Sequence, residues 1–381
     1  MAKKVEKVVK EVKKELSANE LKAQRLKALM KIKNQINDKK GKELVKIATE
    51  VVNNKVKTNL PFLDYLTDGG LPRGAFSQIW SKKGGGKSSL CYAIIANVQK
   101  DNGICVYLDF EHTYDKKYAE SFGINPEELF FAQPSSLEEG LNILSSVGNN
   151  ADLIIIDSIV ALGTASENEK DLDEAAKVAS RALKITQFFE KQTGMLDSEN
   201  GPAIVLINQT RTSINMSNPY LSGNDKYPGG NSLEHSLSLS LHLKRLSAKD
   251  SPTVKINGKD TPIGIRIECK VDKTKLKGNE GESIAYNLLK KAPHMDPLDD
   301  VISLGENKGL YTKRGAWMDY AGLSFNGLKA FSDEVRNNKD LADALTKHVM
   351  EGIEPKPFKA QEQSKESDNF EVEVEEVDDI G

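Results

Sequence analysis

Cysteine is scarce in this chain of 381 residues, which has three cysteines and only two tryptophans. Cys91, Cys105 and Cys269 lie in apolar stretches without the spacing of a metal site. We therefore expect reduced core thiols and a cytoplasmic protein rather than a disulfide-stabilised secreted one. Long apolar runs are also missing, because none approaches the roughly 20 residues that span a bilayer. The lysine-rich N-terminus lacks the apolar core of a signal peptide, so we expect no membrane partner.

The two ends of the chain each carry a strong excess of charge of one sign, although the net charge of the whole chain is only −3. Residues 1–55 carry 16 Lys and Arg against 7 Asp and Glu, whereas residues 362–381 carry 9 Asp and Glu against one lysine. A basic arm and an acidic tail on one chain favour a nucleic-acid-binding or self-associating protein. Two ends that serve only solubility are the alternative.

Alternating apolar segments indicate an α/β protein. Near-continuous apolar strands separated by helices predict a mostly parallel sheet covered on both faces. Residues 1–52 are expected to form a helix, because apolar residues recur among lysines between 21 and 32. The expected strands of the parallel sheet are 75–80, 104–110, 129–133, 151–159 and 202–210, and the expected helices are 88–101, 115–123, 136–147 and 170–195.

The later part of the chain changes pattern. Segments 237–246, 263–271 and 283–289 alternate like antiparallel strands and are expected to extend the sheet. We therefore predict a basic helical arm at 1–55, a core domain at 56–294 and a small C-terminal α/β domain at 295–352. Residues 353–381 are charged, have no core-forming pattern and are expected to be disordered.

A glycine cluster after the strand at 75–80 matches the phosphate-binding pattern G-x-x-x-x-G-K-[ST], except that serine replaces the first glycine. Between a strand and a helix, the N–H groups of such a loop converge on phosphate oxygens. Lys87 is expected to reach the β- and γ-phosphates of ATP, and the Ser88 hydroxyl to bind Mg²⁺. A chance glycine-rich turn is the alternative. The expected nucleotide-binding residues are Ser81, Lys82, Lys83, Gly84, Gly85, Gly86, Lys87, Ser88 and Ser89.

Two carboxylates follow expected strands of the same sheet. Asp157 ends the apolar run "LIIID", at the edge where ligands of open α/β sheets bind, and can hold Mg²⁺ or its water shell. Glu111 lies just past the strand at 104–110, where it can deprotonate an attacking water. Asp109 competes for this role, but its place inside the strand favours a structural one. His112 is expected only to hydrogen-bond locally.

Several stretches together resemble the RecA/UvsX family of homologous-recombination ATPases, over roughly residues 56–330. They are "GGLPRG", "LDFEHTYDKKYAESFGI", "IIIDSIVAL", "IVLINQTR", "YPGGNSLEHS", "KVDKTK" and "GAWMDY". The resemblance implies a RecA-like core and gives Glu111 the role of the catalytic glutamate and Asp157 that of the Mg²⁺-associated aspartate. It also implies that Asp115 and Tyr118 contact adenine. Gln209 matches the glutamine that senses the γ-phosphate.

The resemblance implies that two lysines spaced K-x-K reach the ATP of a neighbouring subunit. Lys273 and Lys275 fit this spacing, although Lys270 leaves the register open by a few residues. Cations supplied from a second subunit stabilise developing phosphoryl charge and make hydrolysis depend on assembly. A solvated lysine run on an edge strand is the alternative.

Two DNA-contacting loops are expected from the same resemblance. The first lies near 163–173 and leads to a helix with basic residues near every fourth position, on one side of the helix. The second, 211–231, is too long for a plain connection. Its arginine is expected to contact phosphate, its isoleucine to lie between bases, and its glycine-rich end to bind a phosphate without reading sequence. The expected DNA-binding residues are Lys177, Arg181, Lys184, Arg211, Ile214, Gly229, Gly230 and Asn231.

These observations predict an ATP-dependent DNA recombinase that forms a helical filament on single-stranded DNA, with Mg²⁺ and ATP as cofactors. Duplex DNA is the expected second substrate, and single-strand-binding and loader proteins are candidate partners in a bacterial or phage-infected cell. A ring-forming helicase with the same core is one alternative, and a non-catalytic recombination mediator is another. The long loop after Gln209 disfavours the helicase. The joint presence of Lys87, Ser88, Glu111 and Asp157 disfavours the mediator.

Overall fold

The computed structural model describes residues 18–40, 44–50, 53–158, 199–210 and 230–358. The chain divides into two units, Met1–Asn54 and Lys55–Gly381. No helix within the described ranges is both long enough and apolar enough to cross a bilayer.

The first unit contains the helix α2 (Ala18–Lys40) and a short 3-10 turn at Ala48–Glu50. A single helix over 1–52 is therefore wrong, because α2 ends at Lys40 and residues 44–47 are not helical. The Asn37 side chain accepts the backbone N–H groups of Leu44 and Val45 at 3.0 and 2.9 Å, which holds the chain after the helix in a different direction. The apolar side chains of α2 are exposed, including Leu26 and Leu29.

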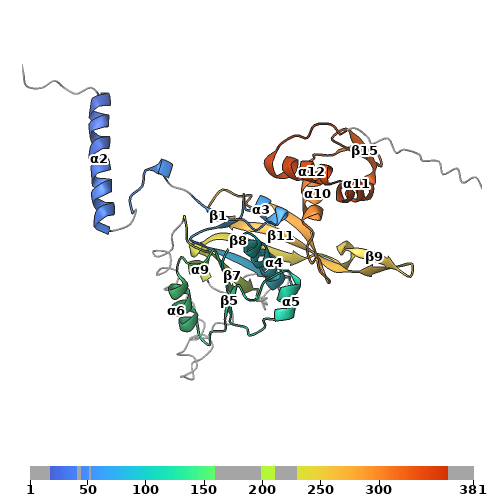
Figure 1. The fold of residues 1–381 in the computed structure, drawn as a ribbon, viewed down its shortest axis with the longest axis horizontal. Coiled ribbons are helices and arrows are strands. Elements are labelled where there is room, and N and C mark those ends of the chain that lie inside the picture. The colour runs from blue at the N-terminus through green and yellow to red at the C-terminus, as the bar shows by residue number, and fades with distance from the viewer. Residues whose placement is uncertain (1–17, 41–43, 51–52, 159–198, 211–229, 359–381) are drawn as a thin grey trace, which may run out of the picture. The chain divides into compact units, whose positions relative to one another are not determined.

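The second unit is built on an eight-stranded sheet in the order β12-β11-β8-β3-β7-β6-β4-β5. Figure 1 labels four of these strands, β5, β7, β8 and β11. Six of its strands are parallel, which confirms the predicted α/β class and the mostly parallel sheet. We call the edge where these six begin the amino edge and the edge where they end the carboxyl edge. They are β3 (Ala75–Ser81), β4 (Cys105–Asp109), β5 (Leu129–Ala132), β6 (Leu153–Asp157), β7 (Ala203–Gln209) and β8 (Leu237–Arg245).

One strand direction differs from the sequence prediction. We expected the segment at 237–246 to be antiparallel, but β8 pairs parallel with β3. The reason is the helix α9 (Gly230–Ser236), which precedes β8 and returns the chain to the amino edge. The antiparallel partner is β11 (Gly264–Thr274), which pairs with β8 on one side and with β12 (Ser283–Leu289) on the other.

Helices cover both faces of the sheet, and alternate residues of each strand contribute to two cores. In β4, Tyr107 lies in one core and Val106 in the other. Cys91, Cys105 and Cys269 are buried and unpaired, as predicted. The first core contains residues of α4 (Lys87–Lys100) and α5 (Lys116–Ser121), and the second contains residues of α6 (Leu137–Val147) and α9.

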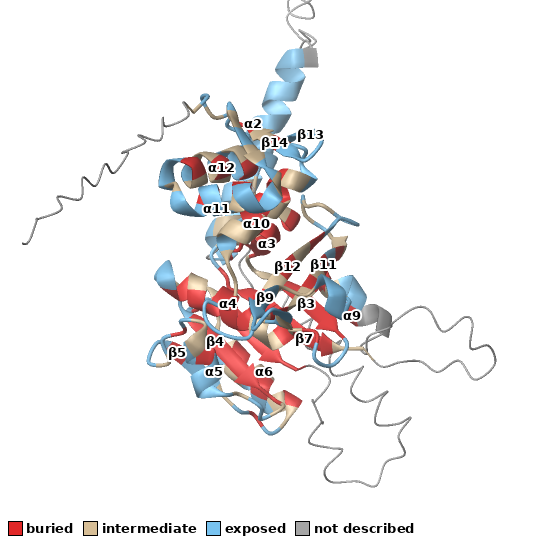
Figure 2. Cartoon of the chain, turned by 90° about the vertical axis from the view of Figure 1, so that its right-hand side faces the viewer, coloured by how far each residue is buried: buried red, intermediate tan, exposed pale blue. Residues whose placement is uncertain are grey.

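The C-terminal part continues the first core (Figure 2). Phe331, Leu345 and Val349 belong to the same buried cluster as Phe62 of α3 (Pro61–Leu66) and Tyr286 of β12. Phe62 and Tyr286 stack with their ring centroids 4.3 Å apart. The elements here are α10 (Pro297–Asn307), β13 (Thr312–Arg314), β14 (Trp317–Tyr320), β15 (Leu323–Asn326), α11 (Gly327–Asn337) and α12 (Lys339–Glu351).

Short strands outside the large sheet were not predicted. β1 (Lys55–Val56) pairs with β2 (Leu71–Pro72), and β9 (Thr253–Ile256) forms a hairpin with β10 (Lys259–Pro262). Asn257 and Gly258 make the hairpin turn with φ of 51° and 77°. Asn-Gly is the strongest short-range hairpin signal, so this element could have been found in the sequence.

Candidate nucleotide site and DNA loops

The glycine-rich loop connects the end of β3 to the start of α4, the strand–loop–helix arrangement that phosphate binding requires. Gly84 and Gly86 have φ of 73° and 84°, which glycine adopts without the steric cost of a side chain. Lys82 and Lys83 are exposed on the loop. The loop thus lies at the N-terminus of α4, where an anion is favoured.

Ser81 fits the position where the pattern has glycine because its side chain bonds within the loop. Its hydroxyl donates to the carbonyl of Lys82 at 2.8 Å and accepts the Lys87 ammonium at 3.2 Å. A Cβ on Gly85 would lie 2.2 Å from Ser81 Oγ. The Ser81 side chain therefore fits only because position 85 is a glycine and has no side chain.

Lys87 is buried, with 7% of its surface exposed. Burial lowers its pKa, while the nearby charges of Asp157 and Glu111 act in the opposite direction. Its Nζ lies 3.2 Å from Ser81 Oγ and 3.4 Å from the Lys82 carbonyl. The ammonium is held at the mouth of the loop, where a phosphate oxygen would satisfy it.

Asp157 lies at the end of β6, beside the first turn of α4. Its Oδ2 accepts hydrogen bonds from Ser88 Oγ at 2.9 Å and from the Tyr107 hydroxyl at 2.6 Å. Burial raises the pKa of Asp157, and these two hydrogen bonds partly counter that effect. Mg²⁺ prefers oxygen ligands and is commonly held by one carboxylate together with substrate phosphates. The Asp157 carboxylate and the Ser88 hydroxyl fit such a site.

Glu111 lies beyond the end of β4 and contacts two other strand ends. Its Oε1 accepts Gln209 Nε2 at 2.8 Å and the hydroxyl of Ser158. Asp109, the competing candidate, accepts hydrogen bonds from the backbone N–H groups of Glu111 and Tyr114 and from Gln133. Asp109 therefore orders the segment that carries Glu111, which is a structural role.

The expected adenine-contacting residues lie beside the loop. Asp115 caps the N-terminus of α5 by accepting the N–H of Tyr118 at 3.1 Å, and the Tyr118 hydroxyl lies 3.0 Å from Ser89 Oγ. His294 was not predicted, and no local sequence signal points to it. Its ring stacks on Phe122 at 4.2 Å and contacts the edge of Tyr118 at 5.5 Å. It thus holds the helix that carries Tyr118.

The side chains of Lys273 and Lys275 extend away from the loop, toward the amino edge, where α9 ends and β8 begins. Lys273 pairs with Ser240 in the β8–β11 ladder, and Ser240 pairs with Gln78, three residues before the end of β3. Three residues of strand span about 10 Å. The ammonium groups of the two lysines bond to the carbonyls of Glu234 and His235, at the end of α9.

These lysines are therefore directed away from the phosphate loop of their own chain. Lys270 instead approaches Asp272 at 3.8 Å.

Most of the expected DNA-binding residues lie outside the described residues. Gly230 and Asn231 begin α9, at the end of the second expected DNA loop. The remaining residues, for which the structure gives no position, are Lys177, Arg181, Lys184, Arg211, Ile214 and Gly229.

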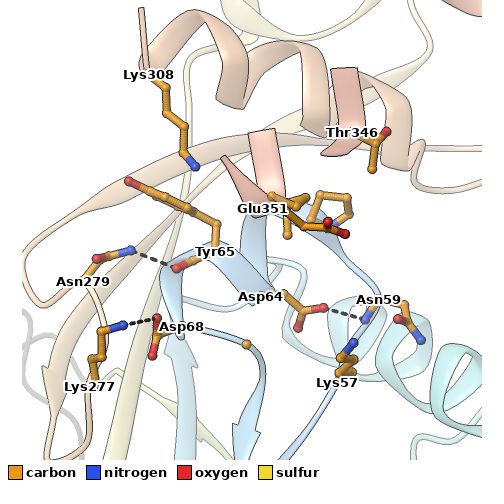
Figure 3. A pocket seen from close by; sticks show the side chains of 13 residues that line it. Lys57, Asn59, Asp64, Tyr65, Asp68, Lys277, Asn279, Lys308, Thr346 and Glu351 are labelled. Carbon is orange, nitrogen blue, oxygen red and sulfur yellow. Dashed lines mark hydrogen bonds and ion pairs between the residues drawn. The ribbon is translucent and has the colours of Figure 1, made fainter. Parts of the chain in front are cut away.

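A large cavity of about 720 Å³ lies between α3, the β11–β12 turn and α12, away from the phosphate loop (Figure 3). Most of the polar groups that line it already bond within the protein. Lys277 pairs with Asp68 at 3.1 Å, and Lys308 lies 4.5 Å above the Tyr65 ring. This cavity presents no set of converging groups for catalysis, whereas the phosphate loop does.

Comparison with known proteins agrees with this geometry. The family model of the RecA N-terminal domain matches residues 26–282. Protein RecA of Aquifex aeolicus is 30% identical over 337 residues, covering 86% of this chain and 93% of that protein. Protein RecA of Campylobacter jejuni subsp. doylei is 29% identical over 291 residues, covering 75% and 80%. The chain therefore belongs to the RecA family of recombination and repair ATPases.

Proposed function

We propose that the chain is an ATP-dependent recombinase that assembles head to tail on single-stranded DNA and pairs it with homologous duplex DNA. One observation carries the proposal. The phosphate loop and Glu111 lie at the carboxyl edge of the sheet, whereas Lys273 and Lys275 lie near the amino edge. A subunit that stacks the amino edge on the carboxyl edge of its neighbour completes the neighbour's site. Such a heterologous contact that does not close gives an open helical filament.

Each residue has a role in the assembled site. Bound ATP with Mg²⁺ would supply the transferable γ-phosphoryl group. Glu111 accepts a proton from water at its carboxylate, which Gln209 and Ser158 hold in place. Lys87, with Lys273 and Lys275 of the adjoining subunit, offsets negative charge on phosphate oxygens. Tyr118, whose hydroxyl lies 3.0 Å from Ser89 Oγ, contacts the base with its aromatic ring.

Gln209 connects the nucleotide site to the expected DNA-binding loop. It donates to Glu111 and is the last residue of β7, and the second expected DNA loop follows after Thr210. Because an amide both donates and accepts, its position can depend on which groups surround the phosphate. ATP then favours the DNA-binding state by its higher affinity for that state. We place the protein in the cytoplasm, with single-strand-binding and loader proteins as partners.

Electron microscopy and phosphate release test the proposal together. Wild-type protein with ATP and single-stranded DNA should form open helical filaments and hydrolyse ATP faster than it does without DNA. Lys87→Ala, the matched control, should do neither. Closed rings would instead favour the helicase. DNA coating that is independent of nucleotide, without turnover, would favour the mediator and contradict the proposal.

A further inference from the structure

Three buried polar side chains lie side by side on one face of the central strands. Gln78 of β3, Asn208 of β7 and Ser240 of β8 are each at most 1% exposed. Two residues earlier on β3 and β7, the same face carries Phe76 and Leu206, which belong to the second core. Leaving a buried polar group without a partner costs about 1–3 kcal/mol, so packing alone does not explain this set.

The three side chains form one connected series, which we call the amide bridge. Asn208 Nδ2 donates to Gln78 Oε1 at 3.1 Å, and Gln78 Nε2 donates to Ser240 Oγ at 3.5 Å, the longest link. Asn208 Oδ1 also accepts the backbone N–H of Gln209 at 2.9 Å. The bridge thus crosses three adjacent strands, in the order β7-β3-β8, and ends at the residue that holds Glu111.

The three strands that the amide bridge connects lead to the expected DNA loop and to the phosphate loop. β7 leads into the second expected DNA loop, and β8 follows α9, where that loop ends. β3 lies between them and leads into the phosphate loop. Ser240 also faces Lys273 in the β8–β11 ladder. The bridge therefore joins both ends of the expected DNA loop to the strand that carries the nucleotide loop.

We propose that Gln78 and Asn208 are positioning residues that couple DNA binding to ATP hydrolysis, by fixing Gln209 against Glu111 according to the state of the DNA loop. The inference rests on the proposed function. Since the bridge is buried, its donors and acceptors cannot be exchanged for water without cost. A displacement of β7 or β8 at the loop therefore changes the hydrogen bonds that reach Gln209.

Gln78→Leu removes both links at once. The quantity to measure is the ratio of ATP turnover with single-stranded DNA to turnover without it. We expect this ratio to fall by about tenfold, within the range typical of coupling between two sites. Nucleotide affinity and the thermal midpoint are measured on the same samples. They separate lost coupling from lost folding.

Gln99→Leu is the matched control. Gln99 is also a buried glutamine with two amide bonds, to the backbone carbonyl and N–H of Asn125 at 3.0 and 2.9 Å, but it lies at the far end of α4. We expect this variant to lose comparable stability and to keep the ratio within about twofold of wild type. Gln78→Glu offers one acceptor to Asn208 and another to the Ser240 hydroxyl, so it should retain the ratio that Gln78→Leu loses.

The outcomes separate the two proposals. If wild-type turnover does not respond to DNA, the proposed function fails, and this inference fails with it. If wild type responds but Gln78→Leu keeps the full ratio, or Gln99→Leu loses it equally, or Gln78→Glu loses as much as Gln78→Leu, only the amide bridge is refuted. Should Gln78→Leu fail to fold, Ser240→Ala replaces it, because this variant removes only the hydroxyl that accepts from Gln78. The ratio of ATP turnover with and without single-stranded DNA then decides in the same way.

Discussion

Lys87 and Asp157 are both buried, and burial shifts their pKa values in opposite directions. The pKa of Lys87 is lowered and that of Asp157 is raised, since a charged form is less stable away from water. Ligands of opposite charge reverse these penalties: a phosphate for the ammonium and a divalent cation for the carboxylate. Lys87 and Asp157 would therefore favour the combined binding of polyphosphate and metal at the proposed site.

Glu111→Gln should abolish the proposed proton acceptor while keeping the geometry, because an amide oxygen still accepts from Gln209 and Ser158. We expect ATP turnover to fall by about 10²–10⁴-fold, the usual contribution of a general base. ATP affinity and DNA binding should persist. Phosphate release and filament lifetime measure these properties. Glu139→Gln, on the exposed surface of α6, is the control, and unchanged turnover in Glu111→Gln would assign the base elsewhere.

Asp300→Asn should stabilise the protein at neutral pH. Asp300 is buried in α10, its Oδ2 has no hydrogen-bond partner among the described residues, and burial with the nearby Asp299 and Asp296 raises its pKa. Because the raised pKa makes the folded state hold a proton that the unfolded state releases, wild-type stability falls as the pH rises above the unfolded value near 3.9.

The stabilisation of Asp300→Asn relative to wild type should therefore be absent near pH 3.5 and grow toward pH 8. Thermal midpoints across this range measure it. We expect a gain of at least about 2 °C at pH 7.5. The exposed Asp340→Asn should show no such trend. A gain that is independent of pH would mean that ionisation of Asp300 is not the cause.

At the scale of elements, the serine at position 81 of the phosphate loop depends on the glycine at position 85. Ser81 places a hydroxyl inside the turn and bonds to Lys82 and Lys87. The turn closes around that side chain because position 85 has none. The departure from the glycine pattern thus involves a pair of positions.

A double-mutant cycle tests this pairing. Gly85→Ala should severely weaken ATP binding, because its Cβ would lie 2.2 Å from Ser81 Oγ and 2.7 Å from Ser81 Cβ. Ser81→Gly removes both atoms, so the double variant should recover much of the affinity. We expect an interaction free energy of about 1–3 kcal/mol, typical of residues in contact. Titration with a fluorescent ATP analogue measures it, and purely additive losses would contradict the pairing.

The strands of the sheet and the helices α4, α5 and α6 were predictable because apolar runs and glycine signals are local, whereas the predicted helix at 170–195 lies outside the described residues. The direction of β8 was not predictable, since it depends on where α9 returns the chain. The phosphate loop, Asp157 and Glu111 follow from motifs at strand ends. His294 reaches the site through a tertiary stack on Phe122, which no local pattern reports. The buried amides in "SQIW" and "LINQ" were a usable signal, because polar residues inside apolar strands need partners.

At the scale of the whole molecule, the two halves of the proposed site lie on opposite edges of the sheet. This separation leads to a complementation test. Lys87→Ala lacks a functional loop, and the double variant Lys273→Ala/Lys275→Ala lacks the lysines. Each should be nearly inactive alone in DNA-dependent hydrolysis.

An equal mixture should recover activity, because a double-variant loop then meets the intact lysines of a Lys87→Ala subunit. Random head-to-tail order gives about one quarter of the interfaces this composition. Phosphate release across mixing ratios measures the recovery, with a maximum at equal amounts. The control is a mixture of Lys87→Ala with about one quarter wild type, which gives the same share of competent interfaces. No recovery above the sum of the separate variants would show that the lysines act within their own chain.

The end of α9 has a consequence for the terminal subunits of the proposed filament. Within a single chain, Lys273 and Lys275 already donate hydrogen bonds to the carbonyls of Glu234 and His235 at the end of α9. At one terminus, Lys273 and Lys275 have no neighbouring loop to reach and keep these internal partners. At the other terminus, a phosphate loop that holds ATP has no neighbouring subunit to supply the two lysines. In the proposed filament we therefore expect hydrolysis to be slowest at that second terminus, so that nucleotide persists there. Growth and shrinkage of the polymer then acquire a polarity that originates in the fold of a single chain.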